Sequence, residues 1–157
     1  MPTGPKVEIR SAQREDCGEL LALMREFAAY VNMLDSLVVD RQKLEAELFD
    51  HWSAEALVAV VDHRIIGYAF YFTIFSSFSG QKGYYLDDLY VSASHRKKGY
   101  GKALLDAVAE KTVRDGYAYL EWRCQDWNLA AIRFYRSLGA SEYDSSRIFK
   151  LNLTAGR

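Results

Sequence analysis

A short loop with two glycines lies between an expected strand and an expected helix, and it constrains the fold more than any other segment. The loop reads His95-Arg96-Lys97-Lys98-Gly99-Tyr100-Gly101-Lys102. Glycines two positions apart let backbone amides turn inward, and a helix N-terminus adds partial positive charge, so the segment suits an anion such as pyrophosphate. A solvated basic loop in which glycine eases the start of the helix explains the octapeptide equally well.

The loop does not match the two common nucleotide-binding motifs. A Walker A motif needs glycine five residues before Gly101 and Ser or Thr after Lys102, but the sequence has Arg96 and Ala103 there. A dinucleotide-binding fingerprint needs a third glycine where Leu104 stands. Neither class of phosphate-binding protein is therefore indicated.

The segments around the loop predict an α+β domain with a mixed sheet. Apolar patterns predict strands over residues 7–10, 56–61, 65–75, 84–91, 117–124 and 147–151, and helices over residues 17–31, 40–50, 101–114 and 128–138. Asp62, His63 and Arg64 predict a hairpin turn, and Gly139 a helix end. With no repeat or linker, we expect residues 1–157 to form a single domain.

Composition limits the partners of the chain. Lys plus Arg number 20 and Asp plus Glu 21, for a net charge of −1, so binding to the nucleic-acid backbone is not expected. The uncharged residues 65–81 contain serines and glycines and predict a buried strand rather than a membrane span. The first ten residues lack the apolar core of a secretory signal, which favours the cytoplasm.

Cysteine and histidine patterns point to no metal. Cys17 and Cys124 lie far apart and have no CxxC spacing, so both are expected to be small core residues. The three histidines, His51, His63 and His95, form no metal-ligand pattern. They are expected to serve packing, as are Trp122 and Trp127.

Two adjacent acids, Asp87 and Asp88, interrupt the strand over residues 84–91, where acids are normally depleted. Adjacent strand residues point to opposite faces, so both acids can face one pocket only if the strand bulges there. The alternative is that one acid pairs with a neighbouring Lys or Arg. We favour a functional role for at least one acid, and the sequence leaves open which one.

With these elements in this order, the sequence resembles the GNAT superfamily of acetyl-CoA-dependent N-acetyltransferases. Arg96 to Gly101 match the superfamily's R/Q-x-x-G-x-G/A coenzyme A loop between a strand and a helix. More narrowly, residues 84–91 and 126–140 are similar to the diamine acetyltransferase branch, which includes spermidine/spermine and thialysine acetyltransferases. The resemblance covers nearly all of the chain.

The resemblance implies a mixed, mostly antiparallel twisted sheet of six to seven strands flanked by about four helices. It also implies that acetyl-CoA, used as a cosubstrate without a metal, lies between strands 84–91 and 117–124. The cofactor-binding residues that it implies are Leu89, Tyr90, Val91, Arg96, Lys97, Lys98, Gly99, Tyr100, Gly101, Lys102, Asn128 and Tyr135. Asn128 fits equally well as a helix N-cap.

The resemblance also implies catalytic roles. The backbone amide of Val91 would polarise the thioester carbonyl, Asp87 would accept a proton from the amine through water, and Tyr135 would act as the general acid at the departing sulfur. Asp88 and Tyr30, with Asp87, would bind a cationic substrate. Without the resemblance, Tyr135 is simply part of the apolar face of its helix.

The implied activity is transfer of the acetyl group of acetyl-CoA to a primary amine of a small molecule, either a diamine or polyamine or a lysine analogue. The amine would attack directly in a ternary complex. Two alternatives remain open: a non-catalytic acetyl-CoA-binding sensor, and an acetyltransferase acting on protein lysines or N-termini. Relatives of this kind imply a homodimer.

Overall fold

The computed structural model describes residues 5–143 and 145–153. The contacts within the chain divide it into two compact units, residues 1–123 and 124–157, and each is described by itself. The single domain expected from the sequence stays a prediction.

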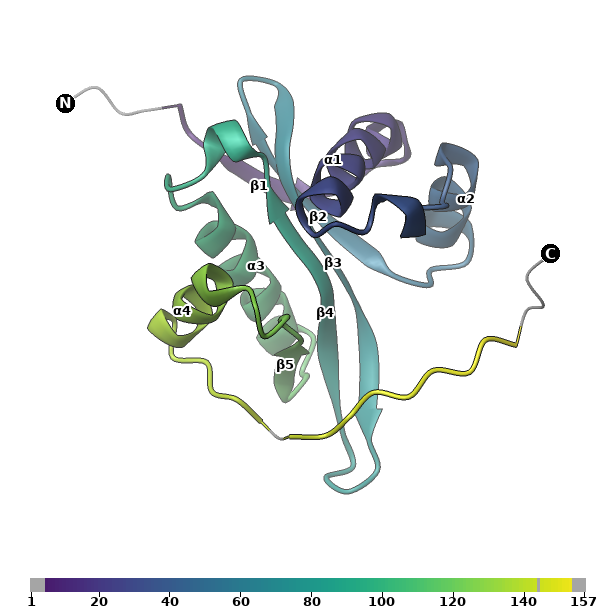
Figure 1. The fold of residues 1–157 in the computed structure, drawn as a ribbon, viewed down its shortest axis with the longest axis vertical. Coiled ribbons are helices and arrows are strands. Elements are labelled where there is room, and N and C mark those ends of the chain that lie inside the picture. Colours follow the sequence, from purple (N-terminus) through teal and green to yellow (C-terminus); the bar gives the residue numbers. More distant parts are fainter. Residues whose placement is uncertain (1–4, 144, 154–157) are drawn as a thin grey trace. The chain divides into compact units, whose positions relative to one another are not determined.

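The first unit is built on a five-stranded mixed sheet (Figure 1). Its strands, in spatial as well as sequence order, are β1 (Glu8–Ser11), β2 (Glu55–Val61), β3 (Arg64–Ser76), β4 (Gln81–Val91) and β5 (Tyr119–Trp122). Neighbours from β1 to β4 are antiparallel, whereas β5 runs parallel to β4. A parallel neighbour requires a crossover, and α3 (Tyr100–Arg114) provides it.

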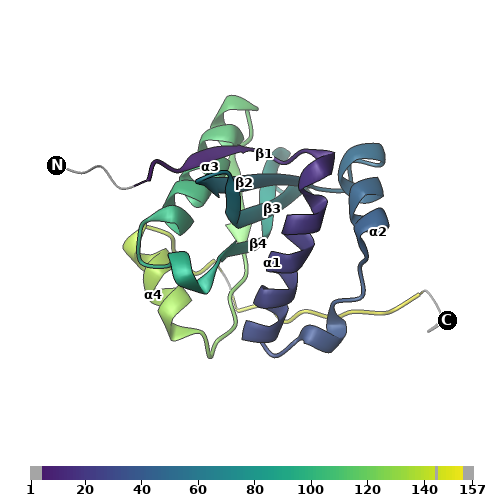
Figure 2. The same ribbon diagram turned by 90° about the horizontal axis from the view of Figure 1, so that it is seen from above.

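Helices cover both faces of this sheet (Figure 2). Helices α1 (Cys17–Tyr30) and α2 (Arg41–Glu45) lie on one face, α2 continuing into a π-helical turn over Ala46–Asp50, and α3 lies on the other. The side chain of Asp40 accepts a hydrogen bond from the amide of Lys43, as expected of the N-cap of α2. The core under α1 and α2 includes Cys17, Leu20, Leu23, Leu44, Leu48, Val58, Tyr68, Phe70 and Tyr90.

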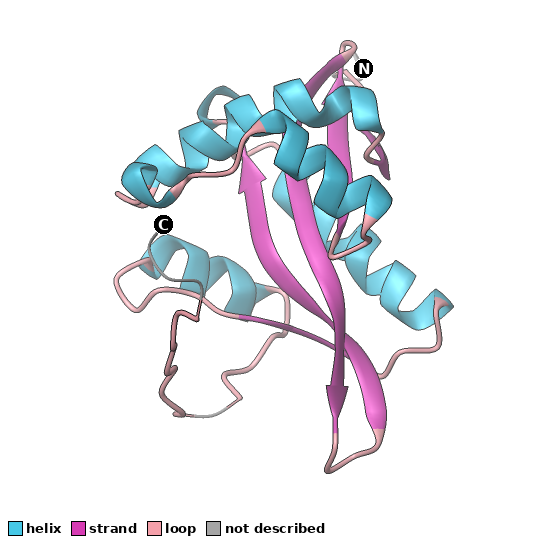
Figure 3. Ribbon diagram, turned by 90° about the vertical axis from the view of Figure 1, so that its right-hand side faces the viewer, coloured by secondary structure: helices cyan, strands magenta, loops and turns pink. Residues whose placement is uncertain are grey.

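Two hairpins follow one another along the chain. Asp62 and His63 connect β2 to β3 with positive φ angles of 49° and 63°, the backbone of a two-residue turn whose twist matches that of the flanking strands. The predicted hairpin is therefore confirmed. Strands β3 and β4 form the longer second hairpin (Figure 3), and β4 begins at Gln81, three residues before the predicted start.

A β-bulge interrupts the pairing of β3 with β4. Phe70 lies opposite Asp88, but the next residue of β3, Tyr71, lies opposite Leu86, so Asp87 is the extra residue. The bulge reverses the side-chain alternation of β4. Leu86 is buried on the side of Tyr71, whereas Asp88 shares a face with Phe70, the face covered by α1.

The predicted strand over residues 147–151 is wrong. These residues form no strand, and Ile148, Phe149 and Leu151 are 64%, 91% and 81% exposed. Their apolar residues favour extended structure, but a strand forms only against a partner, and none pairs with them in the described part of the chain. The expected six to seven strands are therefore corrected to five.

The described residues contain no helix that is both long enough and apolar enough to span a bilayer.

Candidate active site

Strand β4 extends beyond its parallel neighbour. Its pairing with β5 runs only from Gly83 opposite Tyr119 to Leu86 opposite Trp122, while its pairing with β3 continues to Val91. Among the described residues, the side of residues 87–91 that faces away from β3 therefore has no strand partner. The opening follows the point where β4 and β5, the two strands that the resemblance expects to flank acetyl-CoA, stop pairing.

The backbone of β4 presents its hydrogen-bonding groups to this opening. The amide of Ser92 donates to the carbonyl oxygen of Ile66 in the β3 direction, at 2.8 Å. Successive amides of a strand point to opposite edges, so the amides of Val91 and Leu89 point away from β3. Both residues therefore offer main-chain groups at the open edge.

The bulge gathers two carboxylates where β4 loses β5. Asp87 is exposed as a whole residue and Asp88 is half-buried. Protein atoms around the carboxyl group of Asp87 still remove part of its hydration, and this desolvation raises its pKa above its usual range. Burial, and to a lesser extent the charge of Asp87, raises the pKa of Asp88 to about 7. A carboxyl group that titrates near neutral pH can both accept and release a proton under physiological conditions.

Arg96 connects three elements beside this edge. Its Nε donates a 3.1 Å hydrogen bond to the carbonyl oxygen of Val91. The guanidinium group lies 4.7 Å from the ring centroid of Tyr30, the last residue of α1, and 5.3 Å from that of Tyr90. Arg96 thus links the end of α1, the end of β4 and the glycine loop, a structural role that its predicted contact with coenzyme A does not include.

The glycine loop is an exposed turn that ends in the N-terminus of α3. Lys97 and Gly99 have positive φ angles of 62° and 84°, and Gly99 is the N-cap of the helix. The first intrahelical bond runs from the amide of Ala103 to the carbonyl of Gly99 at 3.0 Å. The amides before Ala103 have no partner within the helix and can meet an anion.

The basic side chains of the loop differ in their surroundings. Lys97 and Lys98 are exposed, whereas Lys102 pairs with Asp106 at 2.6 Å. Tyr100 is 9% exposed, so its side chain is part of the buried core and anchors the start of α3. The loop therefore combines a fixed helix start with two solvent-exposed cations.

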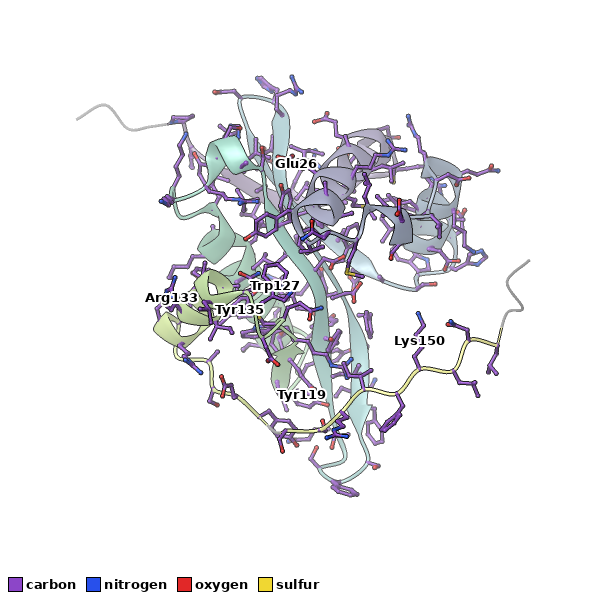
Figure 4. The ribbon with its side chains drawn as sticks, in the orientation of Figure 1. Glu26, Tyr119, Trp127, Arg133, Tyr135 and Lys150 are labelled. Atoms are coloured by element: carbon purple, nitrogen blue, oxygen red, sulfur yellow. The ribbon has the colours of Figure 1, made fainter. Side chains whose placement is uncertain are left out.

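Glu26 belongs to this region, and the sequence alone did not identify it. It lies on α1 (Figure 4), and its Oε1 accepts a 3.3 Å hydrogen bond from the amide of Ala93, at the start of the loop. It also contributes, after burial, to the raised pKa of Tyr90. Glu26 and Tyr30 stand four residues apart on α1 and therefore share one side of the helix. This spacing from a predicted site residue is the sequence signal that could have identified Glu26.

The second unit carries the two remaining predicted site residues. The side chain of Asn128 accepts a 3.3 Å hydrogen bond from the amide of Ala131, which confirms its role as N-cap of α4 (Leu129–Ser137). Tyr135 lies on α4 (Figure 4), its ring centroid 5.4 Å from that of Phe134. Burial, with a smaller contribution from Cys124, raises the pKa of Tyr135 to about 12, so the phenol keeps its proton at neutral pH.

Two packing predictions are corrected here. Trp127 is 54% exposed, so it is not a core residue. Cys124 is only half-buried, and its Sγ lies 3.6 Å from the carbonyl oxygen of Gln125. Both residues stand in the loop before α4, where few neighbours cover the chain. Cys17, by contrast, is fully buried as predicted, and burial raises the pKa of its thiol to about 11.

No group of three or more potential metal ligands occurs among the residues that the structure describes. The opening of β4 carries two carboxylates and main-chain amides, and the rings of Tyr30 and Tyr90 lie beside it against Arg96.

Fold and sequence together define an acetyltransferase. Residues 20–140 match the acetyltransferase (GNAT) family, and the chain belongs to this family. A crystal structure of an aminoglycoside acetyltransferase, meta-AAC0020, superposes with a TM-score of 0.79 at 22% identity, covering 93% of this chain and 97% of that one. This likeness shows the shared fold.

The curated relatives are acetyltransferases as well. The chain is 32% identical over 145 residues to the thialysine N-epsilon-acetyltransferase of Bos taurus, a match that covers 87% of this chain and 85% of the relative. It is 30% identical over 156 residues to the human spermidine/spermine N(1)-acetyltransferase-like protein 1, covering 92% of this chain and 22% of that longer protein.

Proposed function

We propose that this enzyme transfers the acetyl group of acetyl-CoA to a primary amine of a small molecule, either a diamine or polyamine or a lysine analogue. The observation that carries the proposal is the bulge at Asp87, which gathers two carboxylates at the point where β4 parts from β5. Acids at this point can bind a cationic amine and accept its proton. The names of the thialysine and spermidine/spermine relatives support this class of substrate.

The residues of the first unit fit acetyl-CoA. The exposed cations Lys97 and Lys98 and the free amides at the start of α3 suit its phosphates. The amides of Leu89 and Val91 suit the polar groups of its pantetheine arm and its thioester carbonyl. When bound, acetyl-CoA supplies the activated acetyl group. A main-chain donor held in place at such a carbonyl contributes about 3 to 4 kcal/mol to the stabilisation of a transition state.

The acids make the amine reactive. A lysine-like amine has a pKa of ~10.4, so the neutral form near pH 7 costs about 4.6 kcal/mol. Asp87 accepts the proton through water, while Asp88 and Tyr30 hold the charged substrate beforehand. The titration of Asp88 near pH 7 means that Asp88 is also able to take the proton in this pH range.

Tyr135 serves the departing thiol. Its raised pKa keeps the phenol protonated, so its hydroxyl is available to donate a hydrogen bond to the sulfur. Complete proton transfer from a phenol of pKa about 12 to a thiolate, whose conjugate thiol has a pKa of ~8.5, would be uphill by several kcal/mol. Hydrogen bonding to the developing charge is therefore the main contribution of Tyr135, and Asn128 is proposed to contact the pantetheine arm.

The test is a panel of acceptors offered with acetyl-CoA: thialysine, lysine, putrescine, spermidine, an aminoglycoside and a lysine-containing peptide. Free thiol released above the amine-free background, together with the mass of the acetylated product, identifies the substrate class. We expect release with a diamine or a lysine analogue. Release with no acceptor despite coenzyme binding would instead favour the acetyl-CoA sensor, and release with a lysine-containing peptide alone would favour the protein acetyltransferase.

We further propose that the chain acts as a single cytoplasmic domain, and that it forms the homodimer expected from the family resemblance of its sequence. Analytical ultracentrifugation of the purified chain tests the dimer. A homodimer should sediment with about twice the chain mass of 18.0 kDa.

A further inference from the structure

Tyr68 of β3 buries a hydroxyl group that has no hydrogen-bond partner in the described part of the protein. The side chain is 0% exposed and is one of the largest fully buried side chains. A buried hydroxyl left unpaired costs about 1 to 3 kcal/mol, a cost that phenylalanine in the same place avoids. A tyrosine here therefore calls for a polar partner of its own.

The pairing of β3 with β4 places Tyr68 beside the acids. Tyr68 lies opposite Tyr90, and Phe70, two residues along β3, lies opposite Asp88. The Tyr68 ring centroid is 5.0 Å from that of Phe70 and 6.1 Å from that of Tyr90, so these side chains share one face. Asp88 is thus the diagonal neighbour of Tyr68 on that face, within reach of a long aromatic side chain.

The charges around the Tyr68 hydroxyl agree with this placement. Burial is the main cause of its raised pKa, and the charge of Asp88 comes next. Tyr90, Asp87 and Glu26 contribute in turn. The hydroxyl therefore stays protonated throughout the physiological range, as a fixed donor facing a group of acceptors.

We propose that Tyr68 is a positioning residue for the acid pair: its hydroxyl donates a hydrogen bond to the Asp88 carboxylate when this group is charged, and so holds Asp88 toward the water that relays the proton of the acceptor amine. The inference rests on the proposed function. In the relay, the water takes one proton from the substrate ammonium and gives another to the carboxylate. The amine becomes neutral, the carboxyl group is protonated, and Tyr68 keeps its own proton.

The test compares Tyr68→Phe with Tyr71→Phe. Tyr71 is 1% exposed on the same strand but lies on the opposite face, so it controls for the loss of a hydroxyl from a buried ring. Tyr68→Phe should lower kcat about tenfold, as expected for one hydrogen bond in a charged relay, with little change in the KM for the amine. Its melting temperature should not fall, because the ring contacts remain. Tyr71→Phe should keep the wild-type kcat.

A second measurement needs no substrate and so separates this inference from the proposed function. The titratable groups that face Asp88 and Tyr68 are Glu26 from α1 and Asp87 and Tyr90 from β4. Without the Tyr68 donor, the carboxylate form of Asp88 is less stabilised, so its pKa, followed by carbon NMR, should rise by about one pH unit in Tyr68→Phe. An unchanged Asp88 titration would overturn the role of Tyr68 even if the amine is acetylated. Equal loss of kcat in both variants would overturn it as well.

Discussion

The side chain of Arg96 is hydrogen-bonded to the carbonyl oxygen of Val91, Nε to O, at 3.1 Å. Val91 is the last residue of β4 and Arg96 belongs to the glycine loop, so this bond fixes the loop relative to the open edge of the strand. The rings of Tyr30 and Tyr90 hold the same guanidinium group. One side chain thus orders the residues proposed to bind the thioester.

Replacing Arg96 by lysine should disturb this arrangement while keeping the charge. Lysine lacks the planar group that stacks on two rings and the donor in its fixed orientation, so the variant should lose about tenfold in kcat/KM for acetyl-CoA. Steady-state kinetics measures this loss. Arg64→Lys, in the exposed turn between β2 and β3, is the matched control and should behave as the wild type. Equal activity of the two variants would show that the Arg96 contacts do not order the site.

Asp88→Asn should separate stability from activity. The raised pKa means that folded Asp88 holds its proton more tightly than the unfolded chain, so its contribution to stability is full below pH ~3.9 and is lost as pH rises through about 7. The asparagine side chain of Asp88→Asn does not titrate, so the variant does not lose this stability as the pH rises. The variant should therefore match the wild type near pH 4 and be more stable at pH 8 by about 2 to 4 kcal/mol, as measured by denaturant unfolding.

Asp16→Asn is the control for this experiment, and its effect on stability should have the opposite sign. The Arg10 guanidinium beside Asp16 holds the pKa of that carboxyl below its usual range. Asp16→Asn should therefore destabilise the protein at neutral pH, and the difference should shrink as pH falls through the range in which the folded Asp16 titrates. An Asp88→Asn variant that is less stable than the wild type at pH 8 would mean that Asp88 has a stabilising partner and is not poised for chemistry.

The activity of the wild type should follow the ionisation of the acids. If the acid pair accepts the proton of the amine, kcat/KM rises with pH through about 7, the pKa of Asp88. In Asp88→Asn this rise should shift or disappear, and the maximal rate should fall by about two orders of magnitude, as for other proton acceptors in enzymes. A profile unchanged by the substitution would remove Asp88 from the mechanism.

Tyr135→Phe tests the role of the phenol. Loss of the donor at the developing thiolate should lower kcat by about 100-fold, a typical contribution of a general acid. The affinity for coenzyme A, measured by calorimetry, should stay within a few-fold of the wild type, because the ring remains. Full turnover in the variant would leave Tyr135 as a packing residue of α4, the interpretation that its helical face alone suggested.

Gly67 tests how closely β3 and β4 must approach. A methyl group at this position would lie 2.8 Å from the carbonyl oxygen of Tyr90 and 3.2 Å from Val91 Cγ2, so the strand that carries the open edge would have to move. Gly67→Ala should destabilise the fold by about 1 to 3 kcal/mol. It should also lower the acetyltransferase activity, because the open edge of β4 is displaced.

Gly18→Ala is the matched control for Gly67→Ala. In α1 the added methyl group meets only the flexible end of Arg41, at 3.4 Å, and alanine favours the helix by up to about 1 kcal/mol. The melting temperature should therefore fall in Gly67→Ala and rise in Gly18→Ala. A Gly67→Ala protein as stable and active as the wild type would show that β4 adjusts freely at the site.

Local chemistry explains why much of the fold was predictable. Asp40 as a helix cap, the turn at Asp62 and His63, and the helix after Gly99 all follow from preferences of a few adjacent residues. The strand over residues 147–151 failed because apolar residues favour extended structure but do not supply a partner strand. Pairing between distant segments is a property of the whole fold.

The candidate site shows the same division. Two acids side by side in a strand required a bulge if both were to serve one pocket, and the structure has the bulge at Asp87. The sequence could not show that Glu26 meets the amide of Ala93, or that Tyr68 lies diagonal to Asp88, because both relationships depend on which elements pack together. Trp127 was expected to serve packing, yet it lies in a loop and is 54% exposed.

Calorimetric titration of the purified chain with acetyl-CoA is the decisive experiment, because we assign the open edge of β4 and the glycine loop to this molecule. We expect saturable binding at one site per chain, and about tenfold weaker binding when the exposed Lys97 and Lys98 are both changed to alanine. Absence of binding heat from the wild type, with no protection against thermal unfolding at millimolar acetyl-CoA, would contradict this assignment.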